Sequence, residues 1–347
     1  MTPRVRSLAA IRGDKPDRVP VQMDSFLVCA ELAARPYGEV FRDPRLLADS
    51  QLRGQELFGH DIIDVETGIA ALAEACGCRV EYPADSAPWI HEAILHDLSS
   101  KEIQEYLSRA EIPSPARSRP LRVMIEAVDI LALKARDRFL VKAEADQGPF
   151  NLAAQLRGMD QFLLDMIDGQ DYITDLLAFT TEVCCAYARA LSEAGADIVV
   201  SGDSFAGPDV VSPETYEALA FPHEKRLYEG LRSISARKSL HICGNVDAII
   251  GRMVCTGADI LEIDEKTDLR NASSLARGKV CLLGAVSPRL LRAGGPREIR
   301  AETRRVLESM AGNYRFILSP GCSLPGDTPV ENIMAFVETG KAFGAYS

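Results

Sequence analysis

From residue 139 onward, short apolar runs rich in β-branched residues alternate with longer segments of helical spacing. Strands that alternate with helices of this length predict βαβ units, and such units build a parallel sheet. The expected strands in this part of the chain are 139–146, 196–203, 239–243, 258–264, 280–286 and 316–322.

Two earlier runs, VPVQMD at 19–24 and DIIDVE at 61–66, bring the number of expected strands to eight. Eight strands with crossover helices predict an α/β fold of the (β/α)8 TIM-barrel class. The alternative is an open doubly wound sheet. No expected strand is followed by the G-x-G-x-x-G turn that binds dinucleotides in such sheets, so the barrel is favoured.

We expect a single domain over residues 1–347, because α/β barrels reach this length as one unit. Residues 76–122 contain many prolines and show no clear period. This segment is predicted to be an excursion inserted before the third strand, with a small hairpin and two helices near the barrel mouth. No stretch has the composition of a linker between domains.

Composition narrows the classes of function. The formal charge of −11 argues against a broad nucleic-acid surface, which needs an excess of Lys and Arg. No apolar run approaches the ~20 residues that a membrane span needs, and the N-terminus has no signal-peptide pattern. The nine cysteines are scattered along the chain, a pattern that is typical of a protein whose thiols are reduced. We therefore expect a cytoplasmic protein with no membrane or nucleic-acid partner.

The stretch LHICGNV at 240–246 places His241 and Cys243 two positions apart at the end of an expected strand. Side chains at i and i+2 of a strand point to the same face. Cys322 ends the last expected strand, FILSPGC. Active sites of this fold lie at the C-terminal ends of the strands, so the three side chains are expected to converge at the barrel mouth.

One imidazole nitrogen and two sulfurs suit Zn²⁺ best, and three protein ligands leave one coordination position open, as in catalytic zinc sites. The alternative is a buried strand that happens to end in His and Cys, because cysteine is among the most often buried residues.

Polar residues at other strand ends are further candidates for catalysis, substrate binding or a fourth zinc ligand. Their alternative roles are to cap the following helices, to pair with an arginine or to supply turn polarity. Of Glu262 and Asp264, which end one strand together, one is expected to face the mouth. The predicted set is Asp24, Glu144, Asp146, Gln147, Asp203, Asn245 and Asp264.

The whole chain resembles the uroporphyrinogen decarboxylase superfamily, and within it the zinc- and corrinoid-dependent methyltransferase branch. The matching stretches are PDRVPV near the start, GPFNLAAQLRGMDQFLLDM at 148–166, SGDSFAGPDVVSPETYEALAFPHEK at 201–225, LHICGN at 240–245 and LSPGCSLPGDTPVENIMAFVE at 318–338. That branch binds zinc through a His-x-Cys pair and a later Cys, so the resemblance implies His241, Cys243 and Cys322 as zinc ligands.

The resemblance also argues against the founding activity of the superfamily. Porphyrinogen decarboxylases are expected to carry an arginine-bearing segment after the first strand, which binds the acidic side chains of the substrate. Here VQMDSFLVCAEL stands there, with Asp24 and no arginine before Arg35. Such a mouth matches a polycarboxylate poorly.

The implied reaction moves a methyl group between a small molecule and the corrinoid (cobalamin) of a separate partner protein. The small molecule is either a methoxylated compound or a thiol. The residues around Asp24 and the stretch SFAGPDVV are largely apolar, which suits a small neutral or aromatic substrate. This favours demethylation of a methyl donor. The alternatives are a methylcobamide:thiol methyltransferase of the coenzyme M type, a decarboxylase and a non-catalytic binding scaffold. A homodimer is a further possibility.

Overall fold

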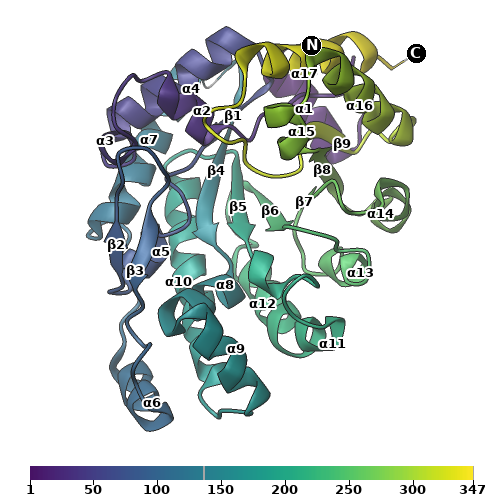
Figure 1. Ribbon diagram of the computed structural model, residues 1–347. Coiled ribbons are helices and arrows are strands. Elements are labelled where there is room, and N and C mark those ends of the chain that lie inside the picture. Colours follow the sequence, from purple (N-terminus) through teal and green to yellow (C-terminus); the bar gives the residue numbers. More distant parts are fainter. Residues whose placement is uncertain (136, 347) are drawn as a thin grey trace.

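The computed structural model describes residues 1–135 and 137–346. Its main sheet is parallel and curved, with the strand order β1-β4-β5-β6-β7-β8-β9 (Figure 1). The strands of this sheet are β1 (Ile62–Val65), β4 (Leu140–Gln147), β5 (Ile198–Gly202), β6 (Arg237–Ile242), β7 (Ile260–Ile263), β8 (Cys281–Val286) and β9 (Phe316–Pro320). Each lies within or overlaps a predicted apolar run, because β-branched residues pack well in a sheet that is buried on both faces.

The predicted first strand, 19–24, closes the ring without forming a regular strand. Val21 pairs with Leu318 of β9, and Gln22 pairs with Ile62 of β1, each as an isolated parallel bridge. Pro20 has no N–H to donate to a ladder, which limits the pairing of this segment. The sheet therefore closes as a TIM-barrel-like fold, with seven regular strands where eight were expected.

Helices connect consecutive strands and pack around the sheet (Figure 1). They are α1 (Pro3–Arg12), α2 (Phe26–Glu31), α3 (Tyr37–Val40), α4 (Pro44–Phe58), α5 (Ala71–Ala75), α6 (Ser100–Arg109), α7 (Arg119–Ala135), α8 (Pro149–Arg157), α9 (Met159–Ile167), α10 (Ile173–Glu193), the 3-10 turn η1 (Ser204–Ala206), α11 (Pro213–Thr215), the π-helical turn η2 (Tyr216–Ala220), α12 (Phe221–Gly230), α13 (Ile250–Met253), α14 (Leu269–Ala276), α15 (Pro288–Ala293), α16 (Pro296–Ser309) and α17 (Val330–Phe343).

Helix ends follow the sequence signals. Ser212 accepts a hydrogen bond from the Thr215 N–H and caps α11, with Pro213 in the first helical position. After α10, Gly195 adopts a φ of 104°, which only glycine takes up readily, and the chain then enters β5. These caps satisfy backbone groups that would otherwise lack partners at the helix ends.

Helix α1 closes the N-terminal end of the barrel. Its Ala10 and Ile11 pack with Ile62, Leu140 and other inward-facing residues of the strands in one apolar cluster. The inside of the barrel is therefore a packed core at this end, which we call the floor. The opposite end, where the strands finish, is the mouth.

Residues 76–122 contain an antiparallel hairpin of β2 (Arg79–Glu81) and β3 (Trp89–Glu92), then α6 and the start of α7. Helix α7 belongs to the barrel, since it packs against α4 and β4. That the segment is an insertion beside the mouth stays a prediction, as does the single domain over 1–347.

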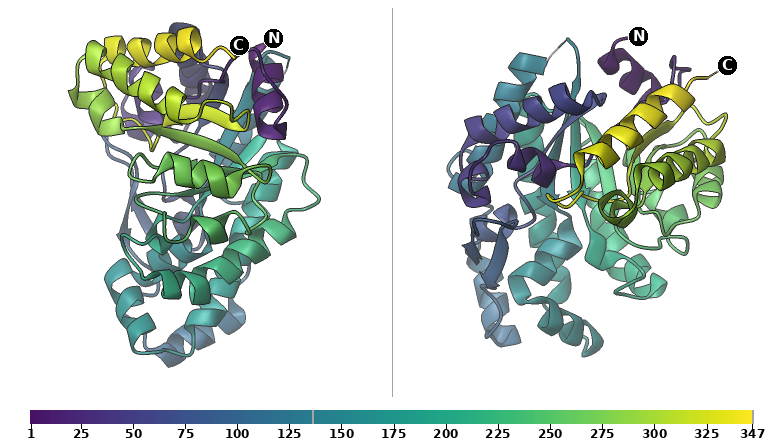
Figure 2. Two further views of the ribbon diagram at one scale, coloured as in Figure 1. Left: turned by 90° about the vertical axis from the view of Figure 1, so that its right-hand side faces the viewer. Right: turned by 45° about the horizontal axis from the view of Figure 1, so that its top comes forward.

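Both termini lie at the same end of the molecule in every view, and α6 and α9 lie at the other end (Figures 1 and 2). The backbone of Arg18 forms an antiparallel bridge with Ala345, which ties the two ends of the chain together. Within the described residues, no helix is long and apolar enough to cross a membrane.

Candidate metal centre

The ends of β6 and β9, which β7 and β8 separate in the sheet, bring three potential ligands together at the mouth. His241 lies near the end of β6, Cys243 follows that strand directly, and Cys322 follows β9. The His241 Nε2 atom lies 2.8 Å from Cys243 Sγ, and the two sulfurs are 3.4 Å apart. One ligand atom from each of the three residues lies within 4.8 Å of the others. The two cysteines can therefore contribute to one metal site although they lie far apart in the sequence.

The electrostatics of this triad favour a thiolate. A hydrogen bond with the Cys322 thiol and the charge of His241 lower the pKa of Cys243 to about 4. His241 Nδ1 is buried and has no hydrogen-bond partner among the described residues. A thiolate, a second thiol and an imidazole form the donor set that zinc prefers, so the three residues fit Zn²⁺.

The triad opens into a cavity of about 230 Å³ at the mouth. Carboxylates and amides from several strand ends surround the two cysteines. The polar and charged lining residues are Asp24, Glu66, Glu144, Asp146, Gln147, Asn151, Ser204, His241, Cys243, Glu262, Cys322 and Ser323. We call this cavity the mouth pocket.

Four of the predicted site residues line the mouth pocket, namely Asp24, Glu144, Asp146 and Gln147. Asp24 accepts a hydrogen bond from the Ser323 hydroxyl at 2.8 Å, next to Cys322. Glu144 pairs with the buried Lys142. Burial raises the pKa of Glu144 to about 7.

The other three predicted site residues make local structural contacts outside the pocket lining. Asp203 is fully buried and accepts hydrogen bonds from the Phe150 and Asn151 N–H groups at 3.3 and 2.7 Å, so it caps α8. Asn245 is exposed and caps its own turn through the Asp247 N–H. Asp264 accepts from the Gly244 N–H at 2.8 Å and supports the loop after Cys243.

The pocket also contains carboxylates and an amide outside the predicted set. Glu66 follows β1, and Asn151 lies on α8. Glu262 of β7 faces the pocket, and Asp264 does not. Glu66 ends the run DIIDVE, so the rule that selected the other strand-end carboxylates would have found it. Asn151 carries no such signal, because it lies inside a helix.

Asp146 has an unusual backbone conformation at the end of β4. Its φ is 62°, and the pairing register of β4 with β5 shifts between Glu144 and Gln147. This irregularity lets Asp146 and its neighbour Gln147 both reach the pocket, whereas a regular strand would alternate them. Asp146 Oδ2 accepts the Leu72 N–H at 2.5 Å, while buried Oδ1 has no partner within the described residues.

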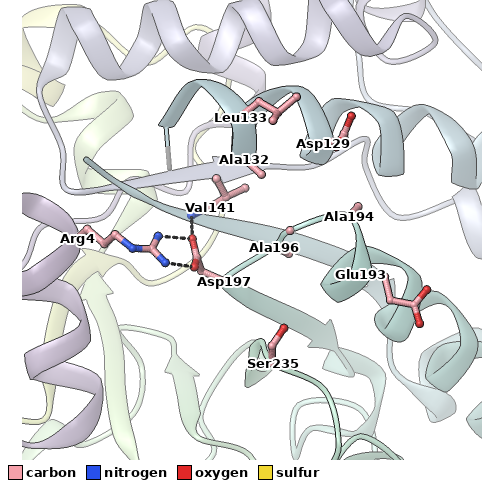
Figure 3. Close-up of a pocket in the computed structure, with 11 residues that line it drawn as sticks. Arg4, Asp129, Ala132, Leu133, Val141, Glu193, Ala194, Ala196, Asp197 and Ser235 are labelled. Atoms are coloured by element: carbon pink, nitrogen blue, oxygen red, sulfur yellow. Dashed lines mark hydrogen bonds and ion pairs between the residues drawn. The ribbon is translucent and has the colours of Figure 1, made fainter. Parts of the chain in front are cut away.

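A second hollow lies at the floor, beside α1 and α7 (Figure 3). Arg4 donates to both carboxylate oxygens of Asp197, at 2.8 and 2.6 Å, and Asp197 also accepts the Val141 N–H at 3.0 Å. Asp129 and Glu193 stand further along the same hollow, as Figure 3 shows. The hollow contains the Arg4–Asp197 ion pair, and none of the described residues that line it is a cysteine or histidine.

Comparison with known proteins supports a common origin over nearly the whole chain. The family model described as uroporphyrinogen decarboxylase (URO-D) matches residues 2–343. A methylcobamide:CoM methyltransferase, MtaA, of Methanosarcina barkeri is 29% identical over 342 residues, which cover 97% of this chain and 96% of that protein. A methylcobamide:CoM methyltransferase, MtbA, of Methanosarcina acetivorans is 26% identical over 346 residues, covering 99% and 98% of the two chains.

A solved structure has the same architecture. It is a methyltransferase from Methanosarcina mazei, which superposes with a TM-score of 0.88 at 27% sequence identity. The match covers 99% of this chain and all of the other.

Proposed function

Since the chain belongs to the uroporphyrinogen decarboxylase family, we propose that it is a zinc-dependent methyltransferase that exchanges a methyl group between a small molecule and the corrinoid of a partner protein. The observation that carries the proposal is the convergence of His241, Cys243 and Cys322 at the edge of the mouth pocket. The methyltransferase names of the relatives agree with the predicted enzyme class.

A thiol is the small molecule that we propose, with the methyl group passing from the corrinoid to sulfur. The relatives named methylcobamide:CoM methyltransferases support this direction. The sequence favoured demethylation of a methoxylated donor on the basis of an apolar mouth. That reasoning draws no support from the pocket, because five carboxylates line it.

In this mechanism His241, Cys243 and Cys322 would hold a zinc ion. Bound zinc lowers the pKa of a coordinated thiol, so that the thiol reacts as a thiolate. Glu144 and Asp146 line the same pocket, and burial raises the pKa of each carboxyl to about 7. Carboxylates with such pKa values can accept the proton that the thiol releases.

Decarboxylation of a porphyrinogen fits the pocket poorly. A polycarboxylate substrate calls for lysines or arginines, and none lines the pocket within the described residues. A non-catalytic scaffold is the other alternative, and it differs from the enzyme in showing no turnover with loaded zinc.

Metal content tests the proposal first. We expect about one zinc per chain in protein purified without chelators, measured by inductively coupled plasma mass spectrometry. The variants Cys322→Ser and Cys243→Ser should each lose most of it. Cys255→Ser is the matched control, because Cys255 is an exposed free thiol outside the site, and it should keep its zinc. Equal zinc in all four proteins, or none in any, would contradict the proposed site.

Turnover is tested with methylcobalamin as a soluble stand-in for the corrinoid protein. Zinc-loaded protein should transfer its methyl group to a small thiol, followed by the change in cobalamin absorbance, and Cys322→Ser should not. Zinc that binds at the triad without any transfer would favour the scaffold.

We propose a cytoplasmic setting on the basis of the cysteines, all nine of which are free thiols. A homodimer stays a prediction.

A further inference from the structure

Lys142 is a buried cation inside the barrel. It lies on β4, and its side chain is fully buried. Its ammonium group contacts three carboxylates, those of Glu144 at 2.5 Å, Asp64 at 3.2 Å and Glu262 at 3.4 Å. Asp64 is its register partner on β1, whereas Glu262 comes from β7, which β5 and β6 separate from β4 in the sheet. Lys142 therefore reaches across the inside of the barrel and joins strands that are not neighbours.

This ammonium group stays charged because acids surround it. Burial alone would lower the pKa of Lys142, but the charges of the three carboxylates raise that pKa well above its usual value. Lys142 does not line the mouth pocket, and its three acidic partners leave it no capacity to bind a ligand. Any effect of Lys142 on the pocket must therefore pass through the carboxylates that it contacts.

Glu144 and Glu262 both contact Lys142 and line the mouth pocket, but they differ in their free oxygens. Glu262 has a partner for each oxygen, since Oε1 accepts the Ser239 hydroxyl at 2.8 Å and Oε2 faces Lys142. Glu144 contacts Lys142 through Oε1, and its Oε2 accepts no hydrogen bond from a described residue. With 13% of its side chain accessible, Glu144 presents a free carboxylate oxygen to the pocket.

The other carboxylates of the pocket are less suited to accept a proton. Asp146 binds a backbone N–H through Oδ2, and its Oδ1 is enclosed. Glu66 makes no ion pair with a described residue, and burial raises its pKa well above the usual value, so its carboxyl group is protonated near neutral pH. Asp24 accepts the Ser323 hydroxyl and contacts no described cation. Among these residues, Glu144 alone combines a free oxygen with a contact to an ammonium group.

We propose that Lys142 is a positioning residue, which holds Glu144 ionised and directed toward the pocket, so that Glu144 takes the proton of the substrate thiol. The inference rests on the proposed methyl transfer and assigns its base. The S–H bond breaks with its electron pair left on sulfur, and the proton adds to Glu144 Oε2 to give a neutral carboxylic acid. Glu144 returns this proton to the solvent before the next turnover.

The protonation of Glu144 depends on this lysine. Burial raises the pKa of Glu144 to about 7, and the ammonium group of Lys142 opposes that rise. A base with a pKa near the working pH can both accept a proton and release it. Without the lysine, Glu144 should be protonated at neutral pH. The other charged groups that face Glu144 are the acids Asp24, Asp64, Glu66 and Glu262.

Two variants that change the charge near Glu144 in opposite directions test the proposal. Zinc-loaded protein is assayed with methylcobalamin and coenzyme M, the thiol in the names of the relatives, and kcat/KM is measured against pH. In Lys142→Met the acid limb of the profile should move up by about one pH unit or more, and kcat at pH 7 should fall about tenfold while KM changes less. In Asp64→Asn a competing acid is lost, so the limb should move down.

Opposite shifts distinguish positioning of Glu144 from support of the fold. A lysine that only supports the fold would lower activity in both variants without moving the limb, and that result would overturn the proposal. Lys142→Met leaves buried acids unpaired and can fail to fold, in which case the downward shift in Asp64→Asn decides. Lys134→Met is the matched control, because Lys134 pairs with Asp49 on the surface, and it should leave the profile unchanged.

A double-mutant cycle with Glu144→Gln identifies the carboxylate. Lys142→Met should add little to the loss of activity in Glu144→Gln, because the lysine acts through this group. An acid limb that persists in Glu144→Gln and is lost in Asp24→Asn would assign the proton to Asp24 and overturn the proposal.

An infrared titration separates this inference from the proposed function. The carbonyl stretch of a protonated carboxyl group, identified by its loss in Glu144→Gln, reports the protonation of Glu144 without turnover. Its midpoint should rise in Lys142→Met and fall in Asp64→Asn, and a midpoint that moves in neither variant overturns the inference. A natural protein that transfers no methyl group contradicts the proposed function, while the infrared midpoint still decides whether Lys142 controls Glu144.

Discussion

At the floor of the barrel, the carboxylates that precede β1 and β5 are paired with arginines, whereas at the mouth the carboxylates that follow the strands face a cavity. Asp61 accepts hydrogen bonds from Arg6, from Arg18 and from the Val21 N–H, at distances between 2.7 and 2.9 Å. For Asp146 at the mouth, the described residues provide a hydrogen-bond donor to only one of its two carboxylate oxygens.

This comparison distinguishes two roles that a buried carboxylate can have. A buried carboxylate that has all its partners holds elements together, and removing a partner is expensive. A buried carboxylate that lacks partners lowers stability and is retained where it meets a ligand. Changes at the floor should therefore act on stability, and changes at the mouth should act on binding.

Asp61→Asn should produce the largest change in stability. It leaves the buried Arg6 and the half-buried Arg18 without their shared carboxylate, so the free energy of unfolding should fall by about 3–5 kcal/mol. Urea unfolding followed by circular dichroism measures this. The folded protein should keep its zinc, because Asp61 lies at the other end of β1 from the mouth. A loss below about 1 kcal/mol would show that the floor pairs matter little.

Asp146→Asn should change the free energy of unfolding in the opposite direction, toward greater stability. Burial raises the pKa of Asp146 from the ordinary 3.8 to about 7, so the unfolded state ionises more easily than the folded state between these values. The folded protein thus loses stability as pH rises from about 4 to about 7, and the loss is complete above that range.

The Asp146→Asn variant should accordingly be more stable than the natural protein by about 2 kcal/mol at pH 8. The gain should shrink as pH falls through 7 and disappear near pH 4. Urea unfolding at several pH values, without ligand, measures the difference. A variant that is less stable at pH 8 would mean that Asp146 is a structural residue like Asp61.

Arg4→Met should have the smallest effect of the three. The Arg4–Asp197 pair is partly exposed, with 28% and 20% of the two side chains accessible, and Asp197 keeps the Val141 N–H. We expect a loss of about 1 kcal/mol that decreases in high salt. Arg232→Met, which breaks an exposed pair with Glu229, is the control and should change stability less.

The strands were predictable because their apolar, β-branched runs are long enough to be read without tertiary information. The segment 19–24 has the same texture, but its pairing is limited to isolated bridges around Pro20. The convergence of His241, Cys243 and Cys322 followed from the barrel rule, since closing the sheet brings the ends of β6 and β9 to one face.

The residues that line the pocket were harder to predict from the sequence. A strand-end carboxylate can turn toward the cavity or toward a helix N-terminus, and the sequence does not distinguish the two. Asp203 meets the start of α8 and caps it, while Glu66 and Asp146 face the cavity. The register shift in β4 is equally hidden, because it depends on pairing with β5 and not on local composition.

Helix α1 has a consequence for the order of events at the site. Ala10, Ile11 and the strand residues around them fill the floor, so among the described residues the mouth is the open end of the barrel. On the proposed function, a small molecule and a bulky cofactor-bearing partner would share this opening. The small molecule would then bind before the partner covers the opening, and its product would leave after the partner withdraws. The proposed function therefore predicts an ordered mechanism of binding and release.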